Sequence, residues 1–545
     1  MTDSKSGWYL KAPCVTLYAF HLRDEISKDP TQINANHLWE QCVALGTADK
    51  LNVAALRSLR TQLLCYKKDD PDGYDPALEK PDHLPNLPLL KKLPRPGEDP
   101  FLRFPVVTEP GTPDLKGEIY PQRIRDTYAV DLSLRYLQTV EIDQLRHFNP
   151  NNCLLPSNIQ ASLGQTLVIF ANPTCGIDNY EVIANECINA FLQDTNRPQP
   201  ELIATGKLFG SPIFEYDTSS VNPLEQCHVL VWLQGHRVWP KRHPDTIALS
   251  EKVYHKFFQL LCCRSKILYA YHQARLCNRE ARKLCSQIEK RVNEFGQMKA
   301  ESENPEERAK RVEELKAWLI EIQQTGFHYA HRLRDMEDHK TAIAINSENY
   351  CYWLSQIRNY SLPEDDLDFL ENFLNRICKH FQEQIQVDLR YLTPAQALFQ
   401  QMIDTIRGIV EIEAEKQAQE REQKQKERDR KLQDTIQCLG VGIGAASIVA
   451  STTGYLTQKD SVPMPFNSYP MHPFTLSLIL SVVAGGVFYA GAWCISGFIN
   501  PRHDKTAKLQ GSVNKKLLNS AKTSISEQVT GVLHKAKFPT QIPRK

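Results

Sequence analysis

Two uncharged apolar stretches near the C-terminus decide the fold: CLGVGIGAASIVASTTGYL at 438–456 and FTLSLILSVVAGGVFYAGAWCISGFI at 474–499. No Asp, Glu, Lys or Arg interrupts either stretch. At about 1.5 Å per residue, helices of these lengths nearly match or exceed the roughly 30 Å hydrocarbon layer of a bilayer. The sequence therefore predicts a hairpin of two transmembrane helices over 438–500.

The charges flanking this hairpin predict its orientation. Ten Lys and Arg follow from Arg502 onward, against only Asp504 and Glu527. The loop between the two stretches carries only Lys459 and Asp460. Because basic residues stay on the cytoplasmic side, we expect both termini in the cytoplasm and the loop outside an inner or plasma membrane. The polar N-terminus, Met1–Trp8, predicts no signal peptide.

Composition limits the classes of partner. The 545 residues carry a formal net charge of +1, so a nucleic-acid partner is not expected. The fifteen cysteines are scattered without a C-x-x-C pair, which is typical of reduced, mostly buried thiols.

Short apolar runs with one helix between them predict a cytoplasmic α/β layer domain over 115–245. The strand-like runs are Tyr128–Leu134, Gln165–Ala171, Pro212–Tyr216 and Cys227–Leu233, and the helix is Asn179–Leu192. The segment GKLFGSPIFEY at 206–216 predicts a hairpin or tight turn with bends at Gly206 and Gly210.

The region before this domain is less regular. We expect residues 1–69 to form a mixed region, with an extended segment at 8–20 and one or two helices at 35–67. Eleven prolines between Asp70 and Pro113 predict a linker or extended wrap over 70–114, in which LRFPVV (102–107) could pair as an edge strand.

Residues 246–393 have helical periodicity and predict a helical domain. One helix is expected over Ser250–Phe295, and a second from Asn304-Pro305 with a break at Gly326. A capping-box pattern at Ser361–Glu364 predicts the start of another.

Pro394 is expected to open a stalk helix over 394–437. Its first part predicts a coiled-coil seam, and its second part has densely interleaved charges, which suit a solvated rod. The seam residues are Leu398, Met402, Ile406 and Ile409. A helix unbroken from Ala395 to Leu456 would be about 93 Å long. The fold class expected is an α+β membrane protein.

The tail over 501–545 predicts a basic amphipathic helix. Its apolar positions recur every four residues, and lysines occupy much of the rest. They are Leu509, Val513, Leu517, Ala521, Ile525 and Val529. Such a helix would either lie on anionic lipid of the inner leaflet or pack on the base of the stalk.

Small residues form one face of the first apolar stretch at spacings of four, three, four and three: Gly440, Gly444, Ser447, Ser451 and Gly454. In a ring of subunits this face could line a water-filled pore. The alternative is close helix–helix approach, the ordinary use of small residues in membranes. Neither span has an acidic residue, so any conduction should be weakly selective.

Two polar clusters are further candidates. His328, His331, Asp335 and Asp338 share a helix face and could hold a divalent cation, or could form a solvated face paired with Arg332 and Arg334. Arg237, Lys241 and Arg242 in HRVWPKRH (236–243) could contact a phosphate-bearing ligand, or could be an exposed basic loop.

Enzyme signatures are missing from the sequence. It contains no G-x-x-x-x-G-K-[ST], H-E-x-x-H or G-x-S-x-G. The prediction is therefore a protein without enzymatic activity and without a cofactor, apart from a divalent cation.

The order of these parts resembles the CorA family of two-span metal-ion transporters, over about 115–510. Tyr469-Pro470 resembles the Tyr-Pro element of the family's external loop. Where that family has Gly-Met-Asn, this chain has Gly454-Tyr455-Leu456, so an apolar leucine replaces the asparagine that would meet a hydrated magnesium ion. The resemblance implies a homo-oligomer, a pentamer in that family, with first spans lining the pore and Tyr455, Leu456, Asn467 and Tyr469 at its entrance.

Two functions follow from these patterns. One is an oligomeric, CorA-like channel or transporter for cations, gated by the cytoplasmic domain. The other is a membrane-anchored, non-conducting sensor or effector, like the relatives without the signature that nucleotide messengers gate in antiviral signalling.

Overall fold

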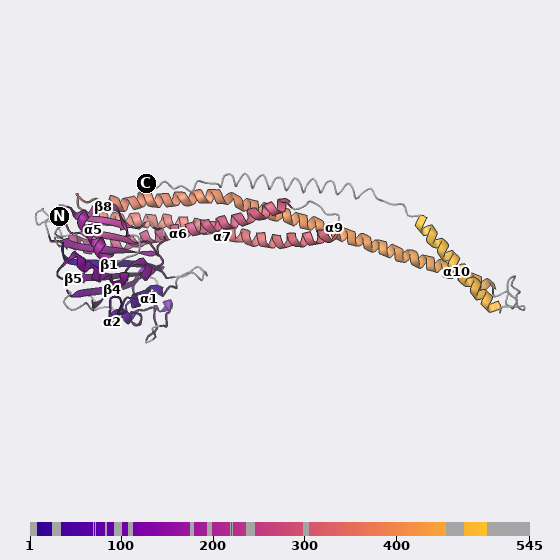
Figure 1. Cartoon of the computed structure of the whole chain (residues 1–545), viewed down its shortest axis with the longest axis horizontal. Helices are drawn as coiled ribbons and strands as arrows, with labels where there is room; N and C mark the ends of the chain where they lie inside the picture. The colour runs from indigo at the N-terminus through magenta and orange to yellow at the C-terminus, as the bar shows by residue number, and fades with distance from the viewer. Residues whose placement is uncertain are drawn as a thin grey trace, which may run out of the picture. The chain divides into compact units, whose positions relative to one another are not determined.

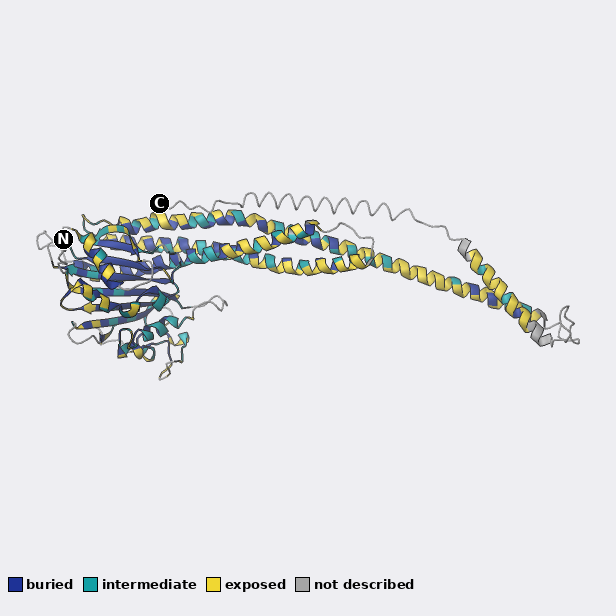
Figure 2. Ribbon diagram, in the orientation of Figure 1, coloured by how far each residue is buried: buried dark blue, intermediate teal, exposed yellow. Residues whose placement is uncertain are grey.

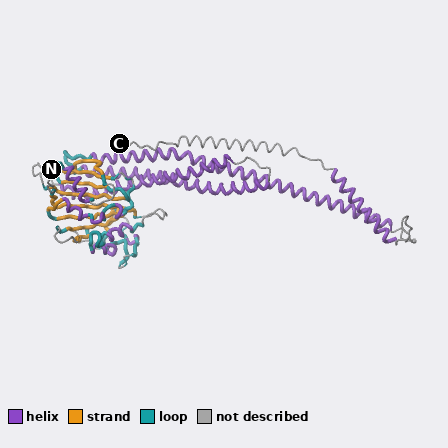
Figure 3. The backbone as a smooth tube through the Cα atoms, viewed as in Figure 1, coloured by secondary structure: helices purple, strands orange, loops and turns teal. Residues whose placement is uncertain are grey.

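The computed structural model describes residues 8–23, 34–68, 70, 72–81, 84–91, 101–106, 113–174, 179–192, 199–218, 220, 222–235, 246–297, 305–453 and 473–498. The chain divides into two units, Met1–Lys283 with Ala330–Thr393, and Leu284–Tyr329 with Pro394–Lys545. Three long helices contribute residues to both units. In the part of the chain that the structure describes, all strands, drawn in orange in Figure 3, precede these helices in the sequence.

The first unit contains one ten-stranded sheet in the order β2-β4-β5-β1-β7-β10-β9-β8, with β3 also paired to β4 and β6 to β1 (Figure 1). The strands are β1 (Tyr9–Leu22), β2 (Asn86–Pro88), β3 (Leu102–Val106), β4 (Leu115–Ile124), β5 (Thr127–Tyr136), β6 (Thr139–Glu141), β7 (Gly164–Pro173), β8 (Glu201–Leu208), β9 (Ser211–Asp217) and β10 (His228–Leu233). β7 and β10 pair in parallel, and the other neighbours pair antiparallel. The four strands expected in the α/β domain are present.

The first strand of the chain lies in the middle of this sheet. Residues Cys14–Leu22 of β1 pair with β5, and Leu10–Phe20 pair with β7 on the other side. Val15, Leu17 and Ala19 are buried. The expected extended segment at 8–20 is confirmed, but the division into a separate 1–69 region and a 115–245 domain is wrong. β1 completes the sheet of the later strands, so both belong to one core.

The proline-rich segment is also part of the sheet where the structure describes it. β2 and β3 both pair with β4, and Leu87 and Leu89 are buried beside it. Proline lacks a backbone donor and is therefore tolerated at sheet edges, which is where these strands lie. The linker prediction for 70–114 is wrong at these strands, while the edge-strand alternative for 102–107 is confirmed over Leu102–Val106.

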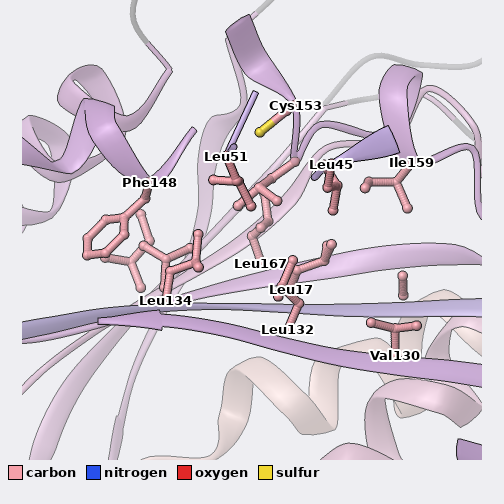
Figure 4. Close-up of a cluster of buried hydrophobic side chains, with 14 of the residues drawn as sticks. Leu17, Leu45, Leu51, Val130, Leu132, Leu134, Phe148, Cys153, Ile159 and Leu167 are labelled. Carbon is pink, nitrogen blue, oxygen red and sulfur yellow. The ribbon is translucent and has the colours of Figure 1, made fainter. Parts of the chain in front are cut away.

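Short helical segments cover one face of the sheet. They are α1 (His37–Ala44), α2 (Ala54–Arg57), α3 (Leu59–Gln62), η1 (Pro76–Leu78), η2 (Ile142–Phe148), η3 (Pro150–Asn152), α4 (Pro156–Ile159) and α5 (Tyr180–Phe191). In Figure 4, side chains from β1, β5 and β7 meet Leu45, Leu51, Phe148, Cys153 and Ile159 from this layer. Burying one such aliphatic side chain contributes about 1.5–3 kcal/mol, so this layer stabilises the unit.

The helices that follow are α6 (Thr246–Gln297), α7 (Pro305–Arg358), α8 (Asp368–Asn372), a π-helical turn η4 (Phe373–Cys378), α9 (Lys379–Thr453) and α10 (Pro473–Phe498). α6 and the start of α7 agree with the expected helices. Gly326 does not interrupt α7, and α8 begins at Asp368 rather than at the expected capping box.

Pro394 lies inside α9 and does not open it, so the expected stalk start is wrong. A proline in a helix interior removes one backbone hydrogen bond. Burial of Leu389 and Leu392 before the proline, and of Ala395 after it, offsets this loss. α9 extends without interruption through Asp434 to Thr453.

In the second unit, the predicted seam of α9 is mostly buried. Met402, Ile406 and Ile409 are buried, and the ring of Phe399 lies 4.7 Å from that of Tyr329. Further along, Arg308 Nη1 lies 3.0 Å from Glu420 Oε1. Residues beyond these are largely exposed, as expected for a solvated rod.

Within the described ranges, two helices are long and apolar enough to cross a membrane: Asp368–Val449, which includes most of α9, and Leu478–Ile495 in α10. Their apolar side chains are exposed, for example Ile443, Ile448 and Val487 at 65 % each (Figure 2). The chain is thus an α+β protein with a sheet domain, long helices and two C-terminal apolar helices.

Candidate functional site

α9 and α10 approach each other closely at two glycines. A Cβ added to Gly442 would stand 3.1 Å from the carbonyl oxygen of Gly485, and one added to Gly485 would stand 3.1 Å from that of Gly442. The same positions touch Tyr489 Cβ at 3.4 Å and Ala446 Cβ at 3.3 Å. Only small residues allow two helix backbones to approach this closely.

The small-residue face predicted from the sequence lies on the other side of α9. A Cβ on Gly440 or Gly444 would meet nothing within 4 Å. Ser447 and Ser451 are exposed, and their hydroxyls donate within the helix to Ile443 O at 2.8 Å and Ile448 O at 2.9 Å. At about 100° per residue, these four positions point away from Gly442 and Ala446.

The helix–helix alternative therefore applies to a different set of residues within this chain. Gly442 and Gly485 make the contact, whereas an added Cβ at Gly440 or Gly444 would meet nothing within 4 Å, and Ser447 and Ser451 are exposed. The sequence carried a signal for the contact, because Gly442-x-x-x-Ala446 is a small-x-x-x-small pattern. We call Gly440, Gly444, Ser447 and Ser451 the small face.

Other predicted site residues lie outside the described residues. These are the last member of the pore series, the four entrance positions and the basic loop: Gly454, Tyr455, Leu456, Asn467, Tyr469, Arg237, Lys241 and Arg242. The predicted amphipathic tail, 501–545, lies there too.

The predicted metal cluster on α7 forms ion pairs. Asp335 lies 3.3 Å from Arg332 Nη1, 3.4 Å from Arg334 Nη2 and 3.7 Å from His331 Nε2. Arg334 Nε also lies 4.0 Å from Asp338, while His328 is exposed. Among the described residues, no group of three or more His, Cys, Asp or Glu could hold a metal ion. The paired polar face is therefore the arrangement present.

A buried charged cluster, absent from the sequence-based candidates, connects the sheet to α6. We call it the junction network: Thr166 (β7), Glu215 and Asp217 (β9), His228 (β10) and Arg264 (α6). His228 Nε2 lies 3.0 Å from Glu215 Oε1, and His228 Nδ1 lies 2.9 Å from Thr166 Oγ1. Arg264 Nη2 donates to Asp217 Oδ2 at 3.0 Å and lies 3.6 Å from Glu215 Oε1.

The two carboxylates of this network differ in electrostatic environment. Burial raises the pKa of Glu215, but His228 and Arg264 together outweigh burial, so its pKa is below the usual value. Burial dominates for Asp217 and raises its pKa despite Arg264. One oxygen of Asp217, Oδ1, is buried without a hydrogen-bond partner.

The junction network is largely shielded from solvent. Thr166, His228 and Glu215 form a hydrogen-bonded row that resembles a nucleophile, base and acid. However, Thr166 is 1 % exposed and His228 is 2 % exposed. The row therefore fixes β7, β9 and β10 against α6, because breaking one partner would leave a buried charge unpaired.

The same network reaches the π turn. The guanidinium of Arg264 lies 5.1 Å from the centre of the Phe373 ring, and the ring of Tyr350 lies 5.3 Å from that of Phe373. Tyr350 Oη donates to Leu370 O at 3.1 Å. Strands β9 and β10 are thus linked through buried side chains to the helix that continues as α9.

Comparison of the chain with protein-family models, curated proteins and solved structures found no match.

Proposed function

We propose that this chain is a subunit of a homo-oligomeric membrane channel for cations, of CorA-like build, and that its small face lines the central path. The sheet domain would lie in the cytoplasm and control the path. The observation that carries the proposal is the exposure of the small face: an added Cβ at Gly440 or Gly444 meets nothing within 4 Å, and Ser447 and Ser451 are exposed.

A helix face that contacts lipid and one that lines a water-filled path favour different residue types. Toward lipid, large apolar side chains such as Ile443 and Ile448 bury the most surface. Glycine and serine bury little apolar surface against lipid. Around a central axis, small residues let copies of α9 approach, and the hydroxyls of Ser447 and Ser451 can meet water and ions. Since neither apolar stretch has an acidic residue, we expect little discrimination among cations.

The order of elements supports the same proposal. A sheet domain is followed by two long helices, by a helix that continues into an apolar segment, and by a second apolar helix. α9 has no break between its charged part and its apolar part. A change at its cytoplasmic end could therefore reach the membrane along one helix.

Reconstitution in lipid vesicles tests this function. Cation flux should be measured for the native chain and for S447C, S451C and I448C in a background carrying C494S. A charged thiol reagent should react quickly with Cys at 447 and 451 and lower the flux, whereas Cys at 448 should react slowly. Flux that is absent, or equal reactivity at all three positions, would refute a path along the small face.

The alternative is a membrane-anchored, non-conducting sensor or effector. The Gly442–Gly485 contact favours it, since the hairpin has its own packing and needs no further copies. The mass of the detergent-solubilised assembly separates the two: a pentamer supports the channel, and a monomer or dimer supports the anchor.

A further inference from the structure

The long helix that ends in the first apolar segment begins with a change from α-helix to π-helix and back. The short α8 is followed by the π-helical turn Phe373–Cys378 and then by α9. Its buried apolar residues are Leu370, Phe373, Cys378, Phe381 and Ile385, at spacings of three, five, three and four. An α-helix returns to the same face after three or four residues, so the step of five needs one π turn.

The loop before α8 is held by the β8–β9 hairpin. The Asp365 carboxylate accepts hydrogen bonds from Phe209 N at 2.8 Å and Gly210 N at 2.7 Å. Phe209 and Gly210 have φ values of 53° and 74°, a left-handed turn that directs both N–H groups to one point. Asp365 also accepts from Leu362 N at 2.8 Å, which fixes the loop's own shape.

Two further contacts complete this hold, which we call the hairpin clamp. Lys207 and Asp366 exchange two backbone hydrogen bonds of 2.9 Å each, so the loop pairs with the edge of β8. Next to them, Phe369 packs on Gly206, where an added Cβ would stand 2.8 Å from Asp366 O. Glycine is needed at 206 because the loop lies directly on the strand.

The other end of α8 is held by Arg264 of the junction network, which lies beside Phe373, and by Tyr350 of α7, which donates to Leu370 O. β9 is thus connected to both ends of α8. The turn before β9 holds the loop that precedes α8, and Arg264, paired with Glu215 and Asp217 of β9, lies beside Phe373 just after α8. α8 has only five residues and cannot hold its own register against these contacts.

We propose that the hairpin clamp and the π turn are two parts of one latch. With the clamp closed, α8 is shifted by one residue from the position that a continuous α-helix with α9 would give it. The π turn accommodates this extra residue. When the clamp opens, α8 slips by one residue and continues as α-helix into α9. A slip of one residue turns α8 by about 100° and moves it by about 1.5 Å. The latch rests on the proposed function only for its consequence in a membrane, since it would connect the sheet edge to the helix that enters the channel.

Hydrogen exchange of the detergent-solubilised full chain, followed by mass spectrometry, tests the latch without any need for conduction. D365N keeps the side-chain shape but removes the charge, and G206V opens the clamp by steric conflict with Asp365 untouched. In both variants, amides of 362–367 should exchange about tenfold faster. Amides of 374–380 should exchange more slowly, because α-helical hydrogen bonds replace the poorer π-helical ones.

E364Q is the matched control, since Glu364 is exposed, adjoins Asp365 and loses the same charge. It should leave both segments unchanged. Faster exchange at 362–367 in D365N and G206V with unchanged or faster exchange at 374–380 would overturn the latch.

A deletion of the exposed Asn375 gives a second test. The deletion shortens the spacing between Phe373 and Cys378 from five residues to four, which an α-helix accommodates without a π turn. D365N added to this deletion should therefore no longer alter hydrogen exchange at 374–380. If the deletion variant does not fold, D365N and G206V decide alone. Neither result bears on flux through the native chain.

Discussion

Gly442 on α9 and Gly485 on α10 lie backbone to backbone, with each position 3.1 Å from the other's carbonyl oxygen as measured from an added Cβ. Contacts of this kind place Cα–H groups near carbonyl oxygens, which adds weak attraction to dense packing. Because this contact turns the Gly442 side of α9 toward α10, the opposite side, which carries the small face, remains available for contact with other molecules.

Substituting these glycines should separate the two sides of α9. G442V and G485V should lower the stability of the hairpin by about 1–3 kcal/mol, the usual cost of overpacking. G440V should leave it unchanged, because nothing lies within 4 Å. Loss of helix on titration with sodium dodecyl sulfate measures this. Equal midpoints for G440V and G442V would contradict the packing described. A loss of flux in G440V alone would agree with a path along the small face.

Glu79 should be essential for the sheet unit. It is fully buried, 2.9 Å from Arg23 Nε and 3.3 Å from Arg123 Nη1, and it accepts a hydrogen bond from Tyr128. E79A should cost about 3–5 kcal/mol because two arginines lose their shared partner. D72N, which removes a carboxylate that is 87 % exposed and 3.1 Å from Arg60, should cost less than about 1 kcal/mol. Thermal unfolding of both variants gives the comparison.

Asp131 should make stability fall with rising pH. Burial raises its pKa to about 7, while Tyr254 and Ser133 donate hydrogen bonds to it and Glu118 repels its charge. Between about pH 4 and 7 the unfolded chain has released this proton and the folded chain retains it. The native state therefore loses about 4 kcal/mol across this window.

D131N tests this by removing the titration. Its stability relative to the native chain should increase from pH 4 to pH 7 and then level off, as measured by unfolding temperature. D126N is the control of opposite sign. Partial burial raises the pKa of Asp126, but Lys266 outweighs burial and the net pKa is lowered, so Asp126 stabilises the fold at higher pH. A flat difference for D131N would show that Asp131 is not neutral in the folded state.

Pro394 should be the weak point of α9. It cannot donate to the carbonyl of Arg390, which leaves one helical hydrogen bond unmade. P394A restores this donor and should slow hydrogen exchange at 391–398 several-fold. The exposed Gln400 to Ala serves as a helix-propensity control and should have little effect. Unchanged exchange in P394A would mean that the proline does not limit the local stability of α9.

Local pattern was sufficient to locate single elements in the sequence, although it did not show which strands pair. β5, β7, β9, β10 and α5 were predicted within two residues or so because each is an apolar run bounded by turn residues. β1 was recognised as extended but not placed. Its partner for Cys14 is Arg135, more than a hundred residues away, and no local signal carries that pairing.

The candidate site shows the same limit. The small face could be listed from spacing alone, but its direction depends on which residues α10 covers. The junction network had a signal, since Glu215 and Asp217 are two apart and share one face of a strand. Their partners, His228 and Arg264, come from other elements, so their pairing could not be read from β9. Pro394 was misread because a local stop signal was outweighed by burial on both sides of it.

The central place of β1 has a consequence for the order of synthesis. β1 leaves the ribosome before its two neighbours in the sheet, β5 and β7, which end at Tyr136 and Pro173. At roughly 5–20 residues per second, the newborn chain carries an unpaired apolar strand for on the order of ten seconds or more. During that time β1 is open to mispairing, so production of this protein should depend strongly on chaperones that shield this strand until β7 is made.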